Sequence, residues 1–327
     1  MIIETHDLTR TFVRRGWNGR TKTETTAVDR LNLTVASGES VGYIGANGAG
    51  KSTTIKMLMG ILVPTSGTVR TVGLDPLRQR REVARRVGVV FGQRSQLWWD
   101  LPARRSFDIL AAIHRLDPHE ARSRTNRLVD RLELGEFLDQ PVRQLSLGQR
   151  MRAEVAAALL HSPELLILDE PTIGLDVLSK QRLREFLIAE RADRGLSLLL
   201  TTHDMGDVER LCERIVLVDR GTAAYDGSLT GLIGTVGAAR VLVLDLDRPT
   251  PDLRVDGARH LSSEAGGMRQ RLELTGPLPA VLAAVSETAT VRDLSVDEPD
   301  IEDVVRQLYE RSRPPGATPS GDRPPST

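Results

Sequence analysis

The sequence predicts an α/β fold with a mostly parallel sheet, because short apolar runs alternate with helical patterns along most of the chain. Runs typical of buried strands occur at Ser40–Ile44, Leu165–Leu168, Leu198–Thr201 and Ile215–Val218. The first run leads directly into a glycine-rich turn and then into a helical pattern at Lys51–Met59. A strand, a glycine loop and a helix in this order are typical of a loop that binds phosphate.

Two further regions are expected around this sheet. Ile2–Thr5 and Leu31–Ala36 have the pattern of strands, which predicts an antiparallel β region at the start of the chain. The polar stretch between Thr11 and Val28 is expected to be a hairpin or a loop insertion. From about residue 94 to residue 160 the pattern becomes helical and rich in arginine, which predicts a helical lobe inserted into the sheet domain.

Three segments are expected along the chain. Residues 1–228 are expected to form the large α/β domain that contains the glycine loop, and residues 229–312 a small C-terminal α+β domain. The second segment begins with an alternating run at Ala239–Leu246 and closes with a helical pattern at Ile301–Tyr309. Residues 313–327 are rich in Pro, Gly and Ser and are expected to be disordered.

The composition restricts the classes of function. Lys plus Arg and Asp plus Glu both number 44, so the formal net charge is zero, which argues against nucleic-acid binding through a basic excess. The one cysteine, Cys212, excludes an intramolecular disulfide and a cysteine-rich metal site. We find no signal-peptide pattern at Met1–Glu4 and no apolar run of the roughly 18–20 residues that a membrane span needs. We therefore expect a cytoplasmic protein.

The glycine-rich turn matches the phosphate-loop pattern, and its setting between a strand and a helix makes a chance match improbable. Backbone N–H groups of such a loop point at phosphate oxygens. Lys51 would reach the β- and γ-phosphates, and the Ser52 hydroxyl would bind Mg²⁺. The nucleotide-binding residues predicted here are Gly45, Ala46, Asn47, Gly48, Ala49, Gly50, Lys51, Ser52 and Thr53.

Two acidic residues follow the buried strand at Leu165–Leu168. An α/β sheet places its functional groups at the carboxyl ends of such strands. Asp169 is expected to hold Mg²⁺, directly or through water, and Glu170 to polarise the water that attacks the γ-phosphate. Many strands end in an acidic residue, so this assignment depends on the phosphate loop being present as well.

Leu145–Gln149 precedes a strong helical pattern at Arg150–Leu160. Ser146 could serve only as the N-cap of that helix. However, Leu-Ser-x-Gly-Gln followed closely by a strand that ends in two acids resembles the signature of the ABC ATPase family. The resemblance covers about residues 2–228 and comprises several motifs in order. It implies the P-loop NTPase fold and the hydrolysis of ATP.

The resemblance further implies that two copies stack head to tail, with ATP between one copy's phosphate loop and the other copy's Ser146, Gly148 and Gln149. Asp176 resembles the aspartate of the D-loop, which would bridge the two protomers; the alternative is an N-cap for the helix at Val177–Glu190.

Three more residues resemble functional positions of the family. His203 resembles the switch histidine that touches the γ-phosphate, although a lone histidine in a loop is usually structural. Gln93 resembles the Q-loop glutamine, which senses Mg²⁺ and the attacking water, and Gln96 is the alternative. Phe12 fits the aromatic residue that stacks on adenine; Trp17 is the alternative, and Phe12 could also belong to the core.

Trp98 and Trp99 lie where ABC ATPases receive a helix from the transmembrane subunit, and the alternative is packing within the helical lobe. The motifs and the C-terminal extension resemble the multidrug and antibiotic exporter branch. This implies an ATPase subunit that uses ATP and Mg²⁺, dimerises through its ATP sites and drives a separate permease from the inner face of the cell membrane. The alternatives are a non-transport ABC ATPase in translation or DNA repair and a generic phosphate-loop kinase or GTPase, which would lack Leu145–Gln149.

Overall fold

The computed structural model describes residues 1–15, 22–92, 95–236 and 240–297. The chain forms two compact units, Met1–Leu229 and Thr230–Thr327. The division lies next to the one expected from the sequence after residue 228.

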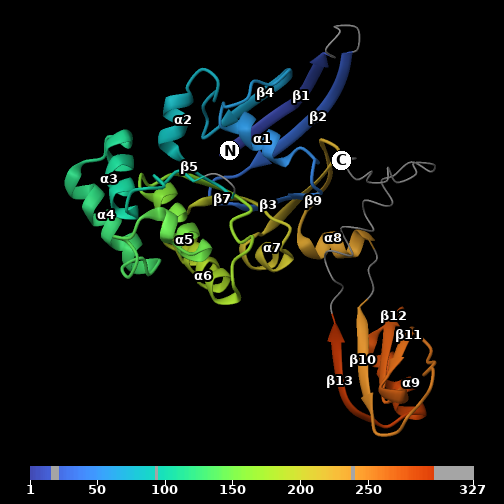
Figure 1. Cartoon of the computed structure of the whole chain (residues 1–327). Helices are drawn as coiled ribbons and strands as arrows, with labels where there is room; N and C mark the ends of the chain where they lie inside the picture. Colours follow the sequence, from blue (N-terminus) through green and yellow to red (C-terminus); the bar gives the residue numbers. More distant parts are fainter. Residues whose placement is uncertain (16–21, 93–94, 237–239, 298–327) are drawn as a thin grey trace, which may run out of the picture. The chain divides into compact units, whose positions relative to one another are not determined.

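The first unit is built on a six-stranded sheet with the strand order β5-β6-β7-β3-β8-β9 (Figure 1). The first five of these strands run parallel, and the last is antiparallel to its neighbour. This confirms the predicted α/β class with a mostly parallel sheet. The strands are β3 (Ser40–Gly45), β5 (Val87–Phe91), β6 (Leu165–Asp169), β7 (Ser197–Thr201), β8 (Arg214–Asp219) and β9 (Thr222–Gly227).

The strands β5, β6, β7 and β8 are mostly apolar and buried because both faces of this part of the sheet are covered, whereas the edge strand β9 is largely exposed. In β6, Leu165 and Ile167 belong to a core that includes α1 (Lys51–Leu58) and the N-terminal strands. Leu166 and Leu168 belong to a second core, which is shared with helices of the helical lobe. Successive side chains of a strand point to opposite faces of the sheet, so the four apolar residues of β6 contribute to the cores on both faces.

A separate three-stranded antiparallel sheet in the order β2-β1-β4 opens the chain. Its strands are β1 (Ile3–Arg15), β2 (Lys22–Val35) and β4 (Ser66–Thr71). β1 and β2 pair as far as Arg15 and Lys22, so the described parts of the stretch between Thr11 and Val28 are paired strands, as the hairpin alternative expected. The strands predicted at Ile2–Thr5 and Leu31–Ala36 were too short, because the outer part of this pair is polar and exposed and lacks an apolar pattern.

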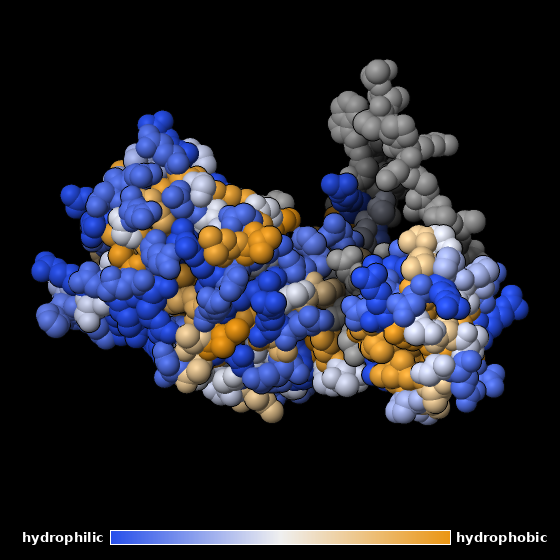
Figure 2. All heavy atoms as spheres, turned by 90° about the horizontal axis from the view of Figure 1, so that it is seen from below, coloured by the Kyte–Doolittle hydropathy of each residue, from blue (hydrophilic) through white to orange (hydrophobic). Residues whose placement is uncertain are grey.

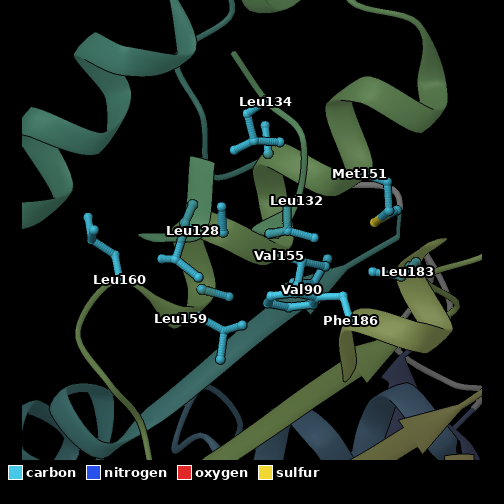
Figure 3. Close-up of a cluster of buried hydrophobic side chains, with 14 of the residues drawn as sticks. Val90, Leu128, Leu132, Leu134, Met151, Val155, Leu159, Leu160, Leu183 and Phe186 are labelled. Carbon is cyan, nitrogen blue, oxygen red and sulfur yellow. The ribbon is translucent and has the colours of Figure 1, made fainter. Parts of the chain in front are cut away.

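The helical lobe packs on one face of the central sheet. Its helices are α3 (Ala103–His114), α4 (Pro118–Arg131) and α5 (Leu147–Leu159), with a short 3₁₀ turn at Val142–Gln144. Figure 3 shows apolar side chains of α4, α5 and β5, such as Leu128, Val155 and Val90, meeting beside Phe186 of α6 (Val177–Arg194). This contiguous core fixes the lobe against the strands that carry the site.

Two more helices complete the described elements of the first unit, α2 (Arg80–Arg86) and α7 (Met205–Leu211). A further helix, α8 (Leu229–Val236), begins at the last residue of the first unit and lies almost wholly in the second. No helix in the described part of the chain is long and apolar enough to cross a bilayer. The face drawn in Figure 2 is mostly hydrophilic, with apolar patches between the charged residues.

The described residues of the second unit include a four-stranded antiparallel sheet in the order β11-β12-β10-β13, with a helix packed on it. Its core includes Leu242, Leu244 and Leu272 from the sheet and Val281 and Val285 from the helix. The helix predicted at 301–309 and the tail 313–327 lie outside the described residues. The elements are β10 (Val241–Leu246), β11 (Ala258–Glu264), a 3₁₀ turn at Ala265–Gly267, β12 (Arg269–Leu274), α9 (Leu278–Thr288) and β13 (Val291–Asp297).

Candidate functional site

The carboxyl ends of the parallel strands bring the predicted motifs together. β3 ends at Gly45, where the glycine loop begins, and β6 ends at Asp169. In the sheet register Asp169 lies opposite Thr201 of β7 on one side and Phe91 of β5 on the other. A parallel sheet binds its ligands at this edge, so the fold places the glycine loop and the acidic pair at the same end.

The glycine loop has a backbone that only glycine adopts easily. Gly48 and Gly50 have φ angles of 84° and 107°, in the left-handed region. A Cβ on Gly50 would lie 2.3 Å from the Ala27 carbonyl oxygen, so the position has no room for a side chain. α1 begins at the next residue, Lys51, and its first turn contains no acidic side chain. Its N–H groups and positive dipole end therefore favour an anion.

A cavity of about 520 Å³ lies between the glycine loop and the acidic pair. This volume is within the range of small-molecule sites. Gly45 and Ala49 of the predicted set belong to the loop without lining the cavity. The lining residues are Ala27, Ala46, Asn47, Gly48, Gly50, Lys51, Ser52, Thr53, Lys56, Ile61, Phe91, Gly92, Asp169, Glu170 and Ile173.

Lys51 is the cation of this cavity nearest to the loop backbone. Its Nζ donates to the carbonyl oxygen of Gly45 at 2.5 Å and to that of Ala46 at 3.3 Å. Burial lowers the pKa of Lys51, and the negative charges of Glu170 and Asp169 partly offset this effect. The ammonium group is thus held partly desolvated inside the loop, where its attraction to phosphate is stronger than in water.

Glu170 contacts His203, with 2.8 Å between Glu170 Oε2 and His203 Nδ1. Glu170 has a φ of 56°, a left-handed conformation that is rare for a residue with a side chain and is frequent at functional sites. Its backbone N–H donates to Thr201 O at 2.9 Å, while Thr201 Oγ1 donates to Asp169 Oδ1 at 2.5 Å. β7 and the loop after it therefore position both acidic residues.

The signature residues lie elsewhere in the unit and cap a helix. Ser146 Oγ accepts from Gln149 N at 3.2 Å, and Gln149 Oε1 accepts from Ser146 N at 2.9 Å, which forms a capping box at the start of α5. Asp176 likewise caps α6, because its Oδ1 accepts from Ser179 N at 2.9 Å. Ser146, Gln149 and Asp176, together with Gly148, are not among the residues that line the cavity.

The remaining predicted residues are placed as follows. Phe12 is 39% exposed on β1, with the Arg10 guanidinium 4.7 Å from its ring centroid, and it does not line the cavity. Gln93 and Trp17 lie outside the described residues. Gln96, the alternative to Gln93, donates from Nε2 to Glu154 O at 3.0 Å.

Several residues of the site are missing from the sequence-based prediction. Ala27 lines the cavity through the folding of a distant segment, while Lys56 lies on α1 and Ile61 shortly after it, and no local pattern marks these residues. Thr201, which binds Asp169, could have been found, because it ends an apolar strand in the same way as Leu168 does before the acidic pair.

The fold and the site define a class of protein. A parallel sheet that presents a glycine loop, a lysine at a helix N-terminus and a strand-end aspartate around one cavity is the arrangement of a phosphate-loop nucleoside triphosphatase.

Comparisons with known proteins identify the family. A family model described as ABC transporter matches residues 28–173. The Nod factor export ATP-binding protein I of Paraburkholderia xenovorans is 36% identical over 255 residues, which are 77% of this chain and 80% of that protein. The daunorubicin resistance ATP-binding protein DrrA3 of Streptomyces coeruleorubidus is 31% identical over 293 residues, 86% of this chain and 90% of that protein.

A solved dimeric structure of an ATP-binding cassette in a post-hydrolysis state, bound to ADP and Pi, superimposes with a TM-score of 0.61. It is 26% identical and covers 69% of this chain and 98% of that chain. The chain therefore belongs to the family of ABC transporter ATP-binding subunits, in its drug-exporter-like branch. It binds and hydrolyses ATP to power transport through a separate permease, and the comparisons do not support the non-transport alternative.

Proposed function

We propose that this subunit works as one half of a head-to-tail dimer, in which the cavity of one copy and the signature of the other enclose ATP and Mg²⁺. One observation carries the proposal. The signature residues Ser146 and Gly148 do not line the cavity of their own chain, although a positive helix N-terminus begins there. A second copy supplies the missing side of the site.

The residues around the cavity fit a magnesium ion. Ser52 and Asp169 both line it and offer a hydroxyl and a carboxylate oxygen. No group of three or more His, Cys, Asp or Glu side chains that could hold a metal occurs in the described residues. This suits Mg²⁺, which binds through one or two protein oxygens, water and substrate phosphates. When bound, the ion neutralises charge that develops on the phosphates.

Glu170 and His203 are proposed as the groups that act on the reacting atoms. Glu170 orients a water molecule and accepts its proton while the water oxygen attacks the γ-phosphorus and the bond to the β-phosphate oxygen breaks. His203, paired with Glu170 at 2.8 Å, holds that carboxylate and faces the γ-phosphate. Lys51 and the loop N–H groups stabilise the charge on the departing ADP. We also propose that Gln93 senses the ion and the water, and that Phe12 stacks on adenine.

Exposed apolar side chains support a docking face next to the signature. Leu147, Ile173, Val177 and Leu178 are 37%, 45%, 83% and 55% exposed. A Cβ on Gly174 would lie 2.8 Å from Leu147 Cδ2, so the segment after the acidic pair touches the signature helix. Apolar side chains gathered beside a polar site are typical of a protein–protein interface. Asp176, at the start of α6, would then face the partner copy.

A second exposed group supports a contact with the permease. Trp98 and Trp99 are 38% and 51% exposed, and Leu101 is 36% exposed. The Arg150 guanidinium lies 5.7 Å from the Trp99 ring centroid, so the ring stays exposed but has a fixed neighbour. Exposed tryptophans anchor many interfaces. We propose that a cytoplasmic helix of the permease binds here and holds the subunit on the inner face of the membrane.

The names of the relatives support an export direction, since one is a Nod factor export protein and another a daunorubicin resistance protein. We propose that residues 229–312 form an accessory domain.

The oligomeric state of Glu170→Gln tests the proposal. This variant keeps the shape of the side chain but cannot accept a proton, so it should bind ATP, fail to hydrolyse it and accumulate as a dimer in light scattering. Removal of ATP should return it to monomers. A variant that stays monomeric with ATP while hydrolysing it at the normal rate would contradict the proposal.

A further inference from the structure

A buried carboxylate links the two loops that carry the proposed catalytic pair. Asp207 of α7 is fully buried. Its Oδ2 accepts from Thr172 Oγ1 and from Thr202 Oγ1, the latter at 3.4 Å, and its Oδ1 accepts from Arg184 Nε at 2.6 Å. Thr172 comes two residues after Glu170. One carboxylate therefore holds both loops.

Two basic residues of α6 complete this network. Arg184 Nη2 lies 2.5 Å from Asp207 Oδ1 and 3.1 Å from Asp204 Oδ1, so its guanidinium bridges the two carboxylates. Lys180, one turn earlier, donates to Asp204 Oδ2 at 2.5 Å. Burial raises the pKa of Asp204, but Lys180 and Arg184 outweigh this and lower it overall. Lys180 and Arg184 thus favour the charged form of Asp204.

The network holds both sequence neighbours of the proposed catalytic histidine. Thr202 directly precedes His203 and Asp204 directly follows it, so both neighbours of the histidine are held by hydrogen bonds. α6, which supplies Arg184, begins at the Asp176 cap next to the signature helix. The network therefore joins the histidine loop to the helix whose start faces the proposed dimer partner.

The free energy lost when these charges are desolvated indicates that the network fixes the geometry of the loops rather than stabilising the fold. Buried ion pairs are often no more stabilising than apolar side chains of the same size, because both charges lose their hydration. The planar guanidinium of Arg184 instead bridges two carboxylates and so fixes both their separation and their orientation, which neither a lysine nor an apolar side chain does.

We infer that Arg184 and Asp207 are positioning residues for ATP hydrolysis, which hold Glu170 and His203 in their paired arrangement and tie that pair to the start of α6. This inference rests on the proposed roles of Glu170 and His203. Neither Arg184 nor Asp207 lines the ATP cavity, so they act through the loops they hold and not on the substrate.

Steady-state kinetics of Arg184→Gln in the full chain tests the inference. A misplacement of about 1 Å in a catalytic group lowers turnover by up to about 100-fold, so we expect kcat to fall between about 10- and 100-fold while the KM for ATP changes less than about twofold. Arg194→Gln is the matched control, because Arg194 also lies on α6 and pairs at 3.0 Å with a buried carboxylate, that of Glu190. The control should leave kcat within about twofold of the wild type.

A second variant, Asp207→Asn, separates positioning from folding. It keeps a side-chain oxygen for Thr172 and Thr202 but removes the charge that Arg184 binds. If the two residues act as one unit, the kcat of the double variant should be no lower than that of the less active single variant. Arg184→Lys, which keeps the charge and lacks the planar fork, should restore the thermal stability lost in Arg184→Gln but only part of its kcat.

Three results would overturn the inference: a kcat for Arg184→Gln equal to that of Arg194→Gln, losses that multiply in the double variant, or a KM that rises in parallel with the fall in kcat. Failure of the proposed function would look different, because Glu170→Gln would then keep hydrolysing ATP whatever Arg184 does.

Discussion

His203 Nδ1 and Glu170 Oε2 lie 2.8 Å apart, although the two residues come from different loops of the sheet edge. The histidine side chain is 68% exposed and the glutamate side chain 23% exposed, so the histidine faces solvent while the glutamate is largely covered. His203 does not itself line the cavity, so it reaches this site through the carboxylate of Glu170, which does.

Replacement of His203 by Ala should lower kcat by about 100-fold, because the carboxylate of Glu170 loses the group that orients it. Binding of ATP should change little, since the cavity is lined by other residues. Equilibrium binding of a fluorescent ATP analogue and a phosphate-release assay would measure the two effects. Equal losses in binding and turnover would assign His203 to binding alone.

Loss of Lys51 should weaken ATP binding rather than the fold. Lys51→Ala removes a partly desolvated cation from the phosphate end of the cavity, and we expect the Kd for ATP to rise at least about tenfold. Lys56→Ala is the matched control, because Lys56 also lines the cavity but follows the first turn of α1. Isothermal titration calorimetry on both variants checks this. Equal effects would show that only the net charge of the cavity matters.

The double change Trp98→Ala and Trp99→Ala should uncouple the subunit from its permease. Truncation of anchoring aromatic residues at an interface costs about 2 kcal/mol or more per hot spot. Basal ATP hydrolysis should stay within about twofold of the wild type, because neither residue lines the cavity. Copurification with the permease from membranes is the measurement. Ile113→Ala, an exposed apolar residue of the same lobe, is the control. A variant that fails to fold would indicate core packing instead.

Acid should destabilise the first unit through a stacked pair of histidines. His114 and His161 rings lie 4.0 Å apart and nearly parallel, and His161 Nε2 lies 3.2 Å from Val87 O. His161 Nδ1 is buried with no hydrogen-bond partner in the described part of the chain. Burial, reinforced by the charge of His114, lowers the pKa of His161 to about 4. Burial also lowers the pKa of His114.

The sign of the effect follows from these depressed values. The folded chain keeps His161 neutral, while the unfolded chain takes up a proton below about pH 6.5. Stability should therefore be independent of this group above pH 7 and fall between about pH 6.5 and 4, by about 3 kcal/mol. Urea midpoints measured across this range should vary less in His161→Phe than in the wild type. The exposed His119→Phe should behave like the wild type.

The sequence predicts those parts of the site whose chemistry lies in consecutive residues. The glycine loop at Gly45–Ser52 and the acid pair after β6 are local motifs, and their meeting follows from the rule that parallel strands end at one edge. The capping box at Ser146 is also a local pattern. Each of these features needs only a short window of sequence and a single strand or helix.

Other parts depend on contacts between distant segments. The approach of Ala27 to Gly50 and the bond from Thr201 to Asp169 join residues far apart in the chain. The strand β5 is absent from the prediction although it is apolar, because it directly follows the arginine-rich helix α2, whose pattern dominates that region. The bridge from Arg184 to Asp207 has no sequence signal at all, since arginines are common on exposed helix faces.

The central claim, that each ATP site is shared by two copies, is tested most directly by mixing two inactive variants. Lys51→Ala damages the loop side of the site, and Ser146→Arg damages the signature side. In a head-to-tail dimer that contains one copy of each variant, one site combines the altered loop with the altered signature. The other site combines the unaltered loop with the unaltered signature and is intact. Mixing should therefore restore roughly a quarter of the wild-type ATP hydrolysis, because about half of the dimers are mixed and carry one of two sites. A mixture that stays as inactive as its two components would contradict the shared site.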